Sequence, residues 1–299
     1  MRFVTFSRGT DGEPTFGIVV DETTVVDLVK GLEGEVDVPE SLLEYIKSGP
    51  ELHRSVVEAV DGREWPAALT CHIDDIVLHA PFRPGKIIGV GLNYVEHVEE
   101  SSRTLDTSES LPTRPVLFSK PGTAVIGPDE PILHNAMMTS ELDWECELAV
   151  VIAHRSKSVT ESDAMNHVFG YSIVNDISAR DQRRSGQWFF SKGQDSFAPF
   201  GPMVVSADEI SDPHSLQLSL TVNGEPRQNG NSKHMLFKIP QLIADITAGV
   251  TLETGDVIAT GSPQGVGAAM VPPTYLLPGD VVAATIEQIG TLSNPVKAV

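Results

Sequence analysis

The sequence predicts a β-rich α+β fold, in which a small N-terminal α/β unit precedes a larger, strand-dominated domain. Six segments in the second part of the chain are rich in β-branched residues, which favours strands: 147–153, 170–178, 202–207, 216–224, 255–260 and 280–287. Glycine and proline are frequent, with 25 and 21 residues, as expected for many turns. With 299 residues, 40% of them hydrophobic, the chain can bury a substantial core without disulfides.

Residues 1–30 are predicted to form short strands around a turn, and 39–60 carries an apolar stripe at helical spacing. The segment PFRPGK contains two prolines and a glycine, which predicts a boundary between a domain at 1–80 and a main domain at 81–299. In the main domain, short helices are expected at 162–167 and 240–248, and Asn223-Gly224 is expected to turn a hairpin.

The composition limits the classes of partner. The formal net charge is −20 with a pI near 4.7, which disfavours nucleic acid and anionic membrane surfaces. No apolar run approaches a membrane span, and the N-terminus lacks a signal-peptide core, so a cytoplasmic location is expected. The two cysteines, Cys71 and Cys146, fit a reduced compartment. An acidic substrate would require a local cation at its binding site.

The segment TSELDWECELAVVI places four acids at alternate positions. On a strand, Glu141, Asp143, Glu145 and Glu147 would share one face, which is costly unless a cation neutralises them. A solvated edge strand is the alternative, although the following VVIA is typical of a buried strand. Asp176 ends a second apolar segment, GYSIVNDIS. Carboxylate ligands without cysteine or clustered histidine favour Mg²⁺ or Mn²⁺ over Zn²⁺.

A possible acid–base pair lies in KIIGVGLNYVEHVEES. His97 and Glu100 are three residues apart, so they would be neighbours on a helix. A carboxylate–imidazole pair of this kind can deprotonate a water molecule. The alternative is a surface histidine within a charged cluster.

Cationic and polar groups elsewhere could contact an anionic substrate. Lys192 lies in an aromatic, glycine-rich stretch, and Arg180 follows Asp176 by four residues. Each could bind a carboxylate, or could form an ordinary ion pair or surface contact. The turn in DVIATGSPQGVG offers backbone amides at Gly261 and the hydroxyls of Thr260 and Ser262 as contacts for an anionic oxygen.

Taken together, these segments resemble the fumarylacetoacetate hydrolase family over the whole chain. The matching strings occur in the family's order: KIIGVGLNYVEHVEE, PVLFSKPGTAVIGPDEPI, LDWECELAVVI, GYSIVNDISARDQ, KGQDSFAPFGP, LTVNGEPRQ and GDVIATGSPQGVG. The resemblance implies a catalytic domain with a mixed β-roll, a small N-terminal domain as in two-part bacterial members, and a homodimer. It also implies Mg²⁺ or Mn²⁺ held by Glu145, Glu147 and Asp176.

The resemblance also implies roles for other residues. His97 and Glu100 match the dyad of acylpyruvase-like members, Lys192 matches a lysine that faces the substrate, and Arg180 matches the arginine after the metal-binding aspartate. Gln194, Thr260, Gly261 and Ser262 lie in matched strings and are expected to contact substrate. The sequence departs from the family's pattern at Ser262, where threonine is usual, and at Arg183, where fumarylacetoacetases have glutamine. Arg183 could favour a more acidic or more hydroxylated substrate, or simply lie on the surface.

The function that follows is metal-dependent hydrolysis of a C–C bond in a 2,4-dioxo acid, either an acylpyruvate or a diketo-deoxy sugar acid. Decarboxylation of oxaloacetate, or isomerisation or hydration of an unsaturated 2-oxo acid, would use the same ligands and stays open. A non-catalytic ligand-binding protein is the alternative from another class. In each case the partner is a small 2-oxo acid.

Overall fold

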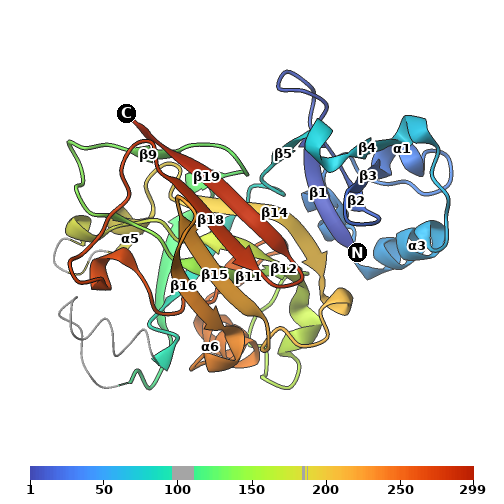
Figure 1. Ribbon diagram of the computed structural model, residues 1–299. Helices are drawn as coiled ribbons and strands as arrows, with labels where there is room; N and C mark the ends of the chain where they lie inside the picture. The colour runs from blue at the N-terminus through green and yellow to red at the C-terminus, as the bar shows by residue number, and fades with distance from the viewer. Residues whose placement is uncertain (96–110, 184–185, 187) are drawn as a thin grey trace.

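The computed structural model describes residues 1–95, 111–183, 186 and 188–299. These residues form two large β-sheets, a two-stranded sheet of β10 (Leu142–Asp143) and β13 (Ser178–Ala179), and few helices (Figure 1). In this part of the chain the main sheet has 12 strands. Its path runs through β4 (Thr70–His72), β3 (Thr24–Asp27), β2 (Thr15–Val19), β1 (Arg2–Ser7), β14 (Ala198–Ser206), β12 (Val168–Asn175), β11 (Cys146–Ile152), β17 (Val257–Ala259), β6 (Lys86–Gly91) and β7 (Val116–Pro121), with β5 (Val77–His79) on β1 and β8 (Val125–Ile126) on β14. The predicted β-rich α+β class is confirmed.

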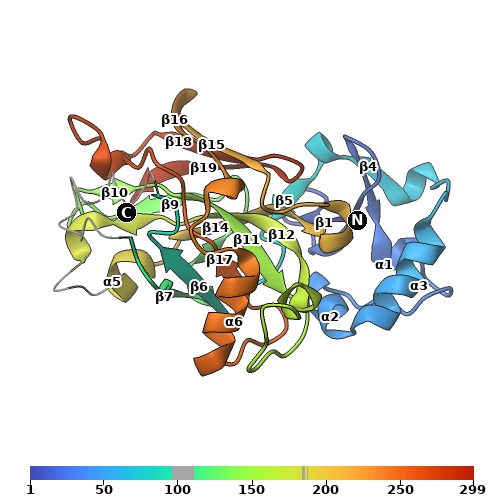
Figure 2. The ribbon, with the colours of Figure 1, turned by 90° about the horizontal axis from the view of Figure 1, so that it is seen from below.

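A smaller sheet covers part of the main sheet, as Figure 2 shows. Its order is β16 (Glu225–Asn231), β15 (Gln217–Val222), β18 (Val281–Ile286), β19 (Gly290–Ala298) and β9 (Ile132–His134). The predicted hairpin is confirmed, because β15 pairs with β16 across Asn223 and Gly224. The six predicted strands are all present, with ends shifted by up to four residues, whereas β7, β9 and β19 were not predicted.

Both faces of the central strands are buried, which explains why β11 is apolar throughout. Leu148 and Val150 belong to a core shared with residues of the smaller sheet, such as Leu220. Ala149 and Val151 point the other way, into a second core with Phe3 and other N-terminal residues. Alternate residues of a strand face opposite sides, so this central strand requires apolar residues at nearly every position.

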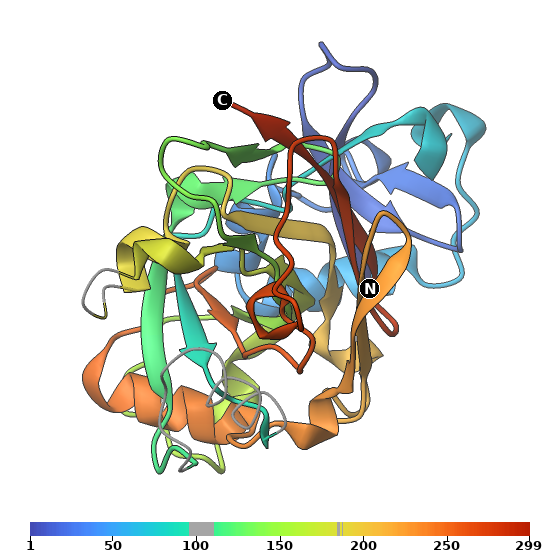
Figure 3. The same ribbon diagram turned by 60° about the vertical axis from the view of Figure 1, so that its left-hand side comes forward.

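The longer helices pack their apolar residues into the same two cores as the strands. In the part of the chain that the structure describes, the α-helices are α1 (Leu28–Gly31), α2 (Leu42–Lys47), α3 (Pro50–Val60), α5 (Trp188–Lys192) and α6 (Ile239–Gly249). The predicted helical stretch 39–60 is split into α2 and α3, because Gly49 adopts a φ of 85° and Pro50 then starts the next helix. Figure 3 shows α6, in orange, along the lower side of the molecule. Among the described residues, no helix has both the length and the apolar character required to cross a membrane.

The N-terminal strands are joined to the main sheet by hydrogen bonds between strands. Phe3 of β1 pairs with Val204 of β14, so the sheet continues from the first 80 residues into the rest of the chain. The predicted division into domains at 1–80 and 81–299 stays a prediction.

Truncation of the central core is expected to be costly. Ile173 in β12 is 0% exposed, within the core that the two sheets share. Ile173→Ala should lower the free energy of unfolding by about 2–5 kcal/mol, because it removes buried methyl groups and leaves a cavity. Urea titration would measure this, with Val20→Ala, at a residue 44% exposed, as the control. A loss for Ile173→Ala no larger than that of the control would contradict the packing described here.

Candidate metal centre

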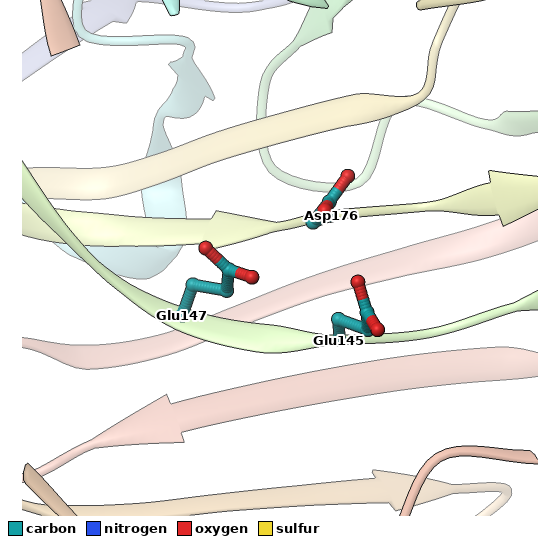
Figure 4. Close-up of side chains that lie close together, drawn as sticks. All are labelled: Glu145, Glu147 and Asp176. Atoms are coloured by element: carbon teal, nitrogen blue, oxygen red, sulfur yellow. The ribbon is translucent and has the colours of Figure 1, made fainter. Parts of the chain in front are cut away.

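Three carboxylates predicted as metal ligands lie together at one end of β11 and β12. Glu145 comes directly before β11, Glu147 is the second residue of β11, and Asp176 follows the last residue of β12. The strands are antiparallel, with Cys146 opposite Asn175, and a 2.8 Å hydrogen bond from Asp176 N to Glu145 O holds their ends in register. One carboxylate oxygen from each of the three residues lies within 4.8 Å of the others (Figure 4). The three acids therefore form a single cluster.

All three carboxylates are buried, since Glu145 is 4% exposed, Glu147 2% and Asp176 0%. Burial raises the pKa of Glu147 well above its ordinary value, and the charges of Asp176 and Glu145 raise it further. The alternative of a solvated edge strand is thus wrong for this segment. A buried cluster of like charges requires cations close by.

Lys192, at the end of α5, is one of these cations. Its ammonium donates to Glu145 Oε2 and to Asp176 Oδ2, each at 2.5 Å, and to Ser178 Oγ at 2.8 Å. Burial alone would lower the pKa of Lys192, but Asp176 and Glu145 raise it overall. The sequence left open whether Lys192 pairs with an anion or lies at the surface. In the structure it is buried and paired with carboxylates of the protein.

A second buried lysine, Lys120 in β7, was missed in the sequence. Its ammonium donates to the other oxygen of Asp176 and to Ile177 O at 3.1 Å. Burial lowers the pKa of Lys120 to about 8, while the charge of Asp176 acts in the opposite direction. The string VLFSKP contained a signal for this buried lysine. Phe118 and Lys120 are two residues apart, so on a strand they face the same side as each other. In the structure both are buried, and the lysine lies on the apolar face of β7.

Arg180 is the third cation and links the cluster to Asp143. Its guanidinium donates to Asp143 Oδ2 and to Glu145 Oε1, each at 2.8 Å. Asp143 also accepts from the backbone N–H groups of Gly267 and Ala268. The expectation of one continuous strand for the four acids was wrong, because β10 (Leu142–Asp143) ends before β11 begins at Cys146, and Arg180 bridges Asp143 and Glu145 across this break. Among the described residues, the four buried carboxylates and three buried cations leave one net negative charge.

The glycine turn after β17 holds Glu147. Gly261 N donates to Glu147 Oε2 at 2.9 Å, and Gly261 has a φ of 94° with space for a Cβ taken by Asn93. The Thr260 hydroxyl donates to Leu148 O at 2.8 Å. The turn therefore fixes a carboxylate of the cluster, and the expected substrate contacts of Thr260 and Gly261 stay predictions.

Gln228 connects the turn to the strand that carries the ligands, a role that was not predicted. Its side-chain oxygen accepts from Cys146 N, and its amide group donates to Ser262 Oγ, both at 2.8 Å. Ser262 is 2% exposed. Its hydroxyl thus takes part in a buried network that aligns the turn with β11.

The remaining predicted residues lie outside the described chain or at the edge of the cluster. His97 and Glu100 fall within 96–110, outside the described residues. Gln194 donates to Phe190 O at 3.1 Å. The Arg183 guanidinium lies over the ring of Trp188, with Cζ 4.4 Å from the ring centroid.

The donor set suits a divalent cation that prefers oxygen ligands. Each member of the cluster offers a carboxylate oxygen, and cysteine and histidine sulfur or nitrogen atoms do not take part in it among the described residues. Hard oxygen donors are the ligands of Mg²⁺ and Mn²⁺, and the like charges that raise the pKa of Glu147 would be offset by either ion. The buried triad can therefore hold a divalent metal ion.

Comparison with known proteins identifies the family. The profile described as "Fumarylacetoacetate (FAA) hydrolase C-terminal" matches residues 86–297, more than half of the chain. The chain belongs to the fumarylacetoacetate hydrolase family. The resemblance predicted from the sequence is thus confirmed, and the match begins at β6, shortly after the predicted boundary.

Relatives within this family cover almost the whole chain. The oxaloacetate tautomerase YisK of Bacillus subtilis is 39% identical over 293 residues, covering 94% of this chain and 95% of its own. A fumarylacetoacetate hydrolase of Exiguobacterium antarcticum has a TM-score of 0.83 at 37% identity, with 100% of both chains covered. The maleylpyruvate hydrolase of Sphingobium sp. SYK-6, whose structure contains manganese(II) and pyruvate, has a TM-score of 0.78 at 28% identity, covering 100% of this chain and 99% of its own. Proteins of this family are enzymes that act on small organic acids.

Proposed function

We propose that this protein is a metal-dependent enzyme that interconverts the keto and enol forms of a small 2-oxo acid, with oxaloacetate as the first substrate to test. The observation that carries the proposal is the pair of buried ammonium groups, Lys120 and Lys192, held against the same carboxylate of Asp176. Enolisation requires a proton to move at carbon while negative charge develops on oxygen, and a site with two cationic proton carriers suits both needs. The 39% identity with an oxaloacetate tautomerase supports the choice of substrate.

The metal is proposed to be Mg²⁺ or Mn²⁺, with Glu145, Glu147 and Asp176 as its ligands. When bound, the ion would act as a Lewis acid toward the 2-oxo acid. It would also reverse the sign of the cluster's charge from one negative to one positive. With a positively charged cluster, the site can bind an anionic substrate even though the whole chain has a net charge of −20.

The chain's own residues supply the rest of the chemistry. Lys192 stays charged beside Glu145 and Asp176 and stabilises the negative charge that develops on the 2-oxo oxygen. In the direction from enol to keto, the Lys120 ammonium donates a proton to the carbon next to the one that carries the hydroxyl, and the amine that remains takes up the proton of that hydroxyl. Arg180 holds Glu145 in place through its link to Asp143.

Removal of the metal provides the first test. Treatment with a chelator should lower the rate of oxaloacetate tautomerisation by more than about 100-fold, because Lewis-acid stabilisation contributes several kcal/mol. Readdition of Mn²⁺ or Mg²⁺ should restore the rate. The decay of the enol's ultraviolet absorbance, corrected for the metal-only reaction, measures this. A rate that is unchanged in the chelator-treated enzyme would exclude the metal-dependent mechanism.

Hydrolysis of a C–C bond in a 2,4-dioxo acid is the second candidate. It is favoured by the spacing of His97 and Glu100, and by the likeness to a maleylpyruvate hydrolase. Acetylpyruvate separates the candidates, since a hydrolase would release acetate and pyruvate. Carbon dioxide from oxaloacetate would instead identify a decarboxylase, and isomerisation of an unsaturated 2-oxo acid would give neither product. Binding of these acids without turnover would favour the non-catalytic alternative.

The homodimer and the cytoplasmic location also stay predictions. The homodimer rests on the family resemblance, and light scattering on the purified protein would give the mass in solution. The acidic surface still argues against nucleic acid as a partner.

A further inference from the structure

Arg183 differs from the other cations around the metal centre. Among the described residues, Lys120, Arg180 and Lys192 each form an ion pair with at least one buried carboxylate, whereas none pairs with Arg183. The Arg183 side chain is half-buried and lies over the Trp188 ring, with Cζ 4.4 Å from the ring centroid. A guanidinium that is partly withdrawn from water, and that forms no ion pair with a carboxylate of the described residues, is available to bind an anion.

Trp188 positions this guanidinium relative to the metal centre. The Lys192 ammonium is 5.9 Å from the same ring centroid, so Arg183 and Lys192 are separated by no more than these two distances combined. The Trp188 ring is held by Phe118, at 5.5 Å between centroids, and by Gly91, where an added Cβ would lie 2.8 Å from the ring. Arg183 is thus supported by a fixed aromatic platform beside the cluster.

The electrostatic surroundings agree with this placement. Burial and the positive charge of Arg180 lower the pKa of Arg183, whereas the Glu145 carboxylate raises it. Arg183 therefore lies close enough to the cluster to interact with two of its members. With a divalent ion bound, the cluster carries one net positive charge, which matches a single substrate carboxylate. A second carboxylate on the substrate requires another cation.

We propose that Arg183 binds a second carboxylate at the far end of the substrate, and so selects 2-oxo dicarboxylic acids over 2-oxo monocarboxylic acids. The inference rests on the proposed function, because it places the 2-oxo end of the substrate at the metal. The planar guanidinium can donate two parallel hydrogen bonds to a carboxylate, which gives direction as well as charge. The sequence left three roles open for Arg183: preference for a more acidic substrate, preference for a more hydroxylated substrate, or a place on the surface. The proposal corresponds to the first of these.

The test uses two stable ligands that differ only at the far end of the molecule. Malate carries a carboxylate where 2-hydroxybutanoate carries a methyl group, and neither requires turnover. Calorimetric titration of the Mn²⁺-loaded protein should show tighter binding of malate by the wild type. Arg183→Gln should weaken malate binding roughly 10- to 100-fold, as expected for loss of a charge-assisted pair, and change 2-hydroxybutanoate binding by less than about two-fold.

Two further variants separate recognition from a structural role. Arg183→Lys keeps the charge but loses the fork, so malate binding should recover in part. Arg155→Gln removes an arginine that is 69% exposed and pairs with Glu253, and should leave both affinities unchanged. The melting temperature of each variant checks that it is folded.

The outcomes distinguish this inference from the proposed function. Equal weakening of both ligands in Arg183→Gln, or no preference for malate in the wild type, would overturn the role of Arg183 even if oxaloacetate is tautomerised. A preference for malate that disappears in Arg183→Gln would support it, even if the wild type failed to tautomerise oxaloacetate. Failure of the wild type to tautomerise oxaloacetate would count against the proposed reaction, and not against the role of Arg183.

Discussion

Glu147→Gln is expected to abolish metal binding and to lower kcat/KM for oxaloacetate by at least about 1,000-fold, since a bound metal contributes several kcal/mol to stabilisation of the transition state. Glutamine has the shape of glutamate, and its amide oxygen can still accept the hydrogen bond from Gly261 N. The substitution therefore removes a negative charge with little change in packing. Metal binding is expected to be lost because one of the three charged ligands is removed.

The same substitution should not destabilise the metal-free protein. Burial and two neighbouring carboxylates raise the pKa of Glu147, which means that the charged form is unfavourable in the folded state. The melting temperature of metal-free Glu147→Gln should equal or exceed that of the wild type, while the increase that Mn²⁺ causes in the wild type should vanish.

Calorimetric titration with Mn²⁺ and thermal melts with and without the ion measure these effects. Glu161→Gln, at an exposed residue, is the matched control and should behave as the wild type. Wild-type affinity for Mn²⁺ in Glu147→Gln would show that the triad is not the metal site. Loss of activity with metal affinity retained would also contradict the ligand assignment.

Lys120→Met is expected to lower kcat for tautomerisation by roughly 10²- to 10⁴-fold, the usual contribution of a positioned proton-transfer group. Methionine keeps much of the lysine's apolar stem but has no amine to carry a proton. Asp176 keeps its contact with Lys192, so the carboxylate is not left without a cation. Removal of one positive charge beside Asp176 should leave the affinity for Mn²⁺ equal to that of the wild type or make it tighter.

A fall in kcat with Mn²⁺ binding as tight as in the wild type would indicate a role in proton transfer. If Lys120 only supported the structure of the site, Mn²⁺ binding would weaken as well. Steady-state kinetics on oxaloacetate and Mn²⁺ titration of the same preparation provide both values. Lys157→Met, at an exposed lysine, is the control for loss of a positive charge. A kcat within about three-fold of the wild type would assign Lys120 to charge balance rather than proton transfer.

Local patterns predicted six strands of the main domain and indicated which acids would gather near one another, although β7, β9 and β19 were not predicted. Runs of β-branched residues predicted β11, β12 and β14, and the spacing of Glu145 and Glu147 placed both side chains on the same face. These predictions depend on neighbours along the chain, which determine strand propensity and side-chain direction. The helical stripe at 39–60 was also local, although its break at Gly49 was overlooked.

Asp143 shows where local reasoning fails. Alternation predicted Asp143 on the same strand and face as Glu145 and Glu147, but the strand is interrupted after β10, and Asp143 binds Arg180 instead of joining the triad. The backbone N–H groups of Gly267 and Ala268, more than 120 residues away, hold it there. The partners of this side chain thus come from a distant loop, which neighbouring residues do not reveal.

The positions of the metal-centre carboxylates in the sequence are enough to suggest a metal site. Which cations balance their charge depends on the pairing of strands that are far apart in the sequence. Lys120 reaches Asp176 across 56 residues of sequence, because β7 pairs with β6, β6 with β17, and β17 with β11. Arg180 reaches Glu145 across 35 residues. Strand propensity and alternation are properties of neighbouring residues, whereas the pairing of distant strands is set by how the whole chain buries its apolar surface.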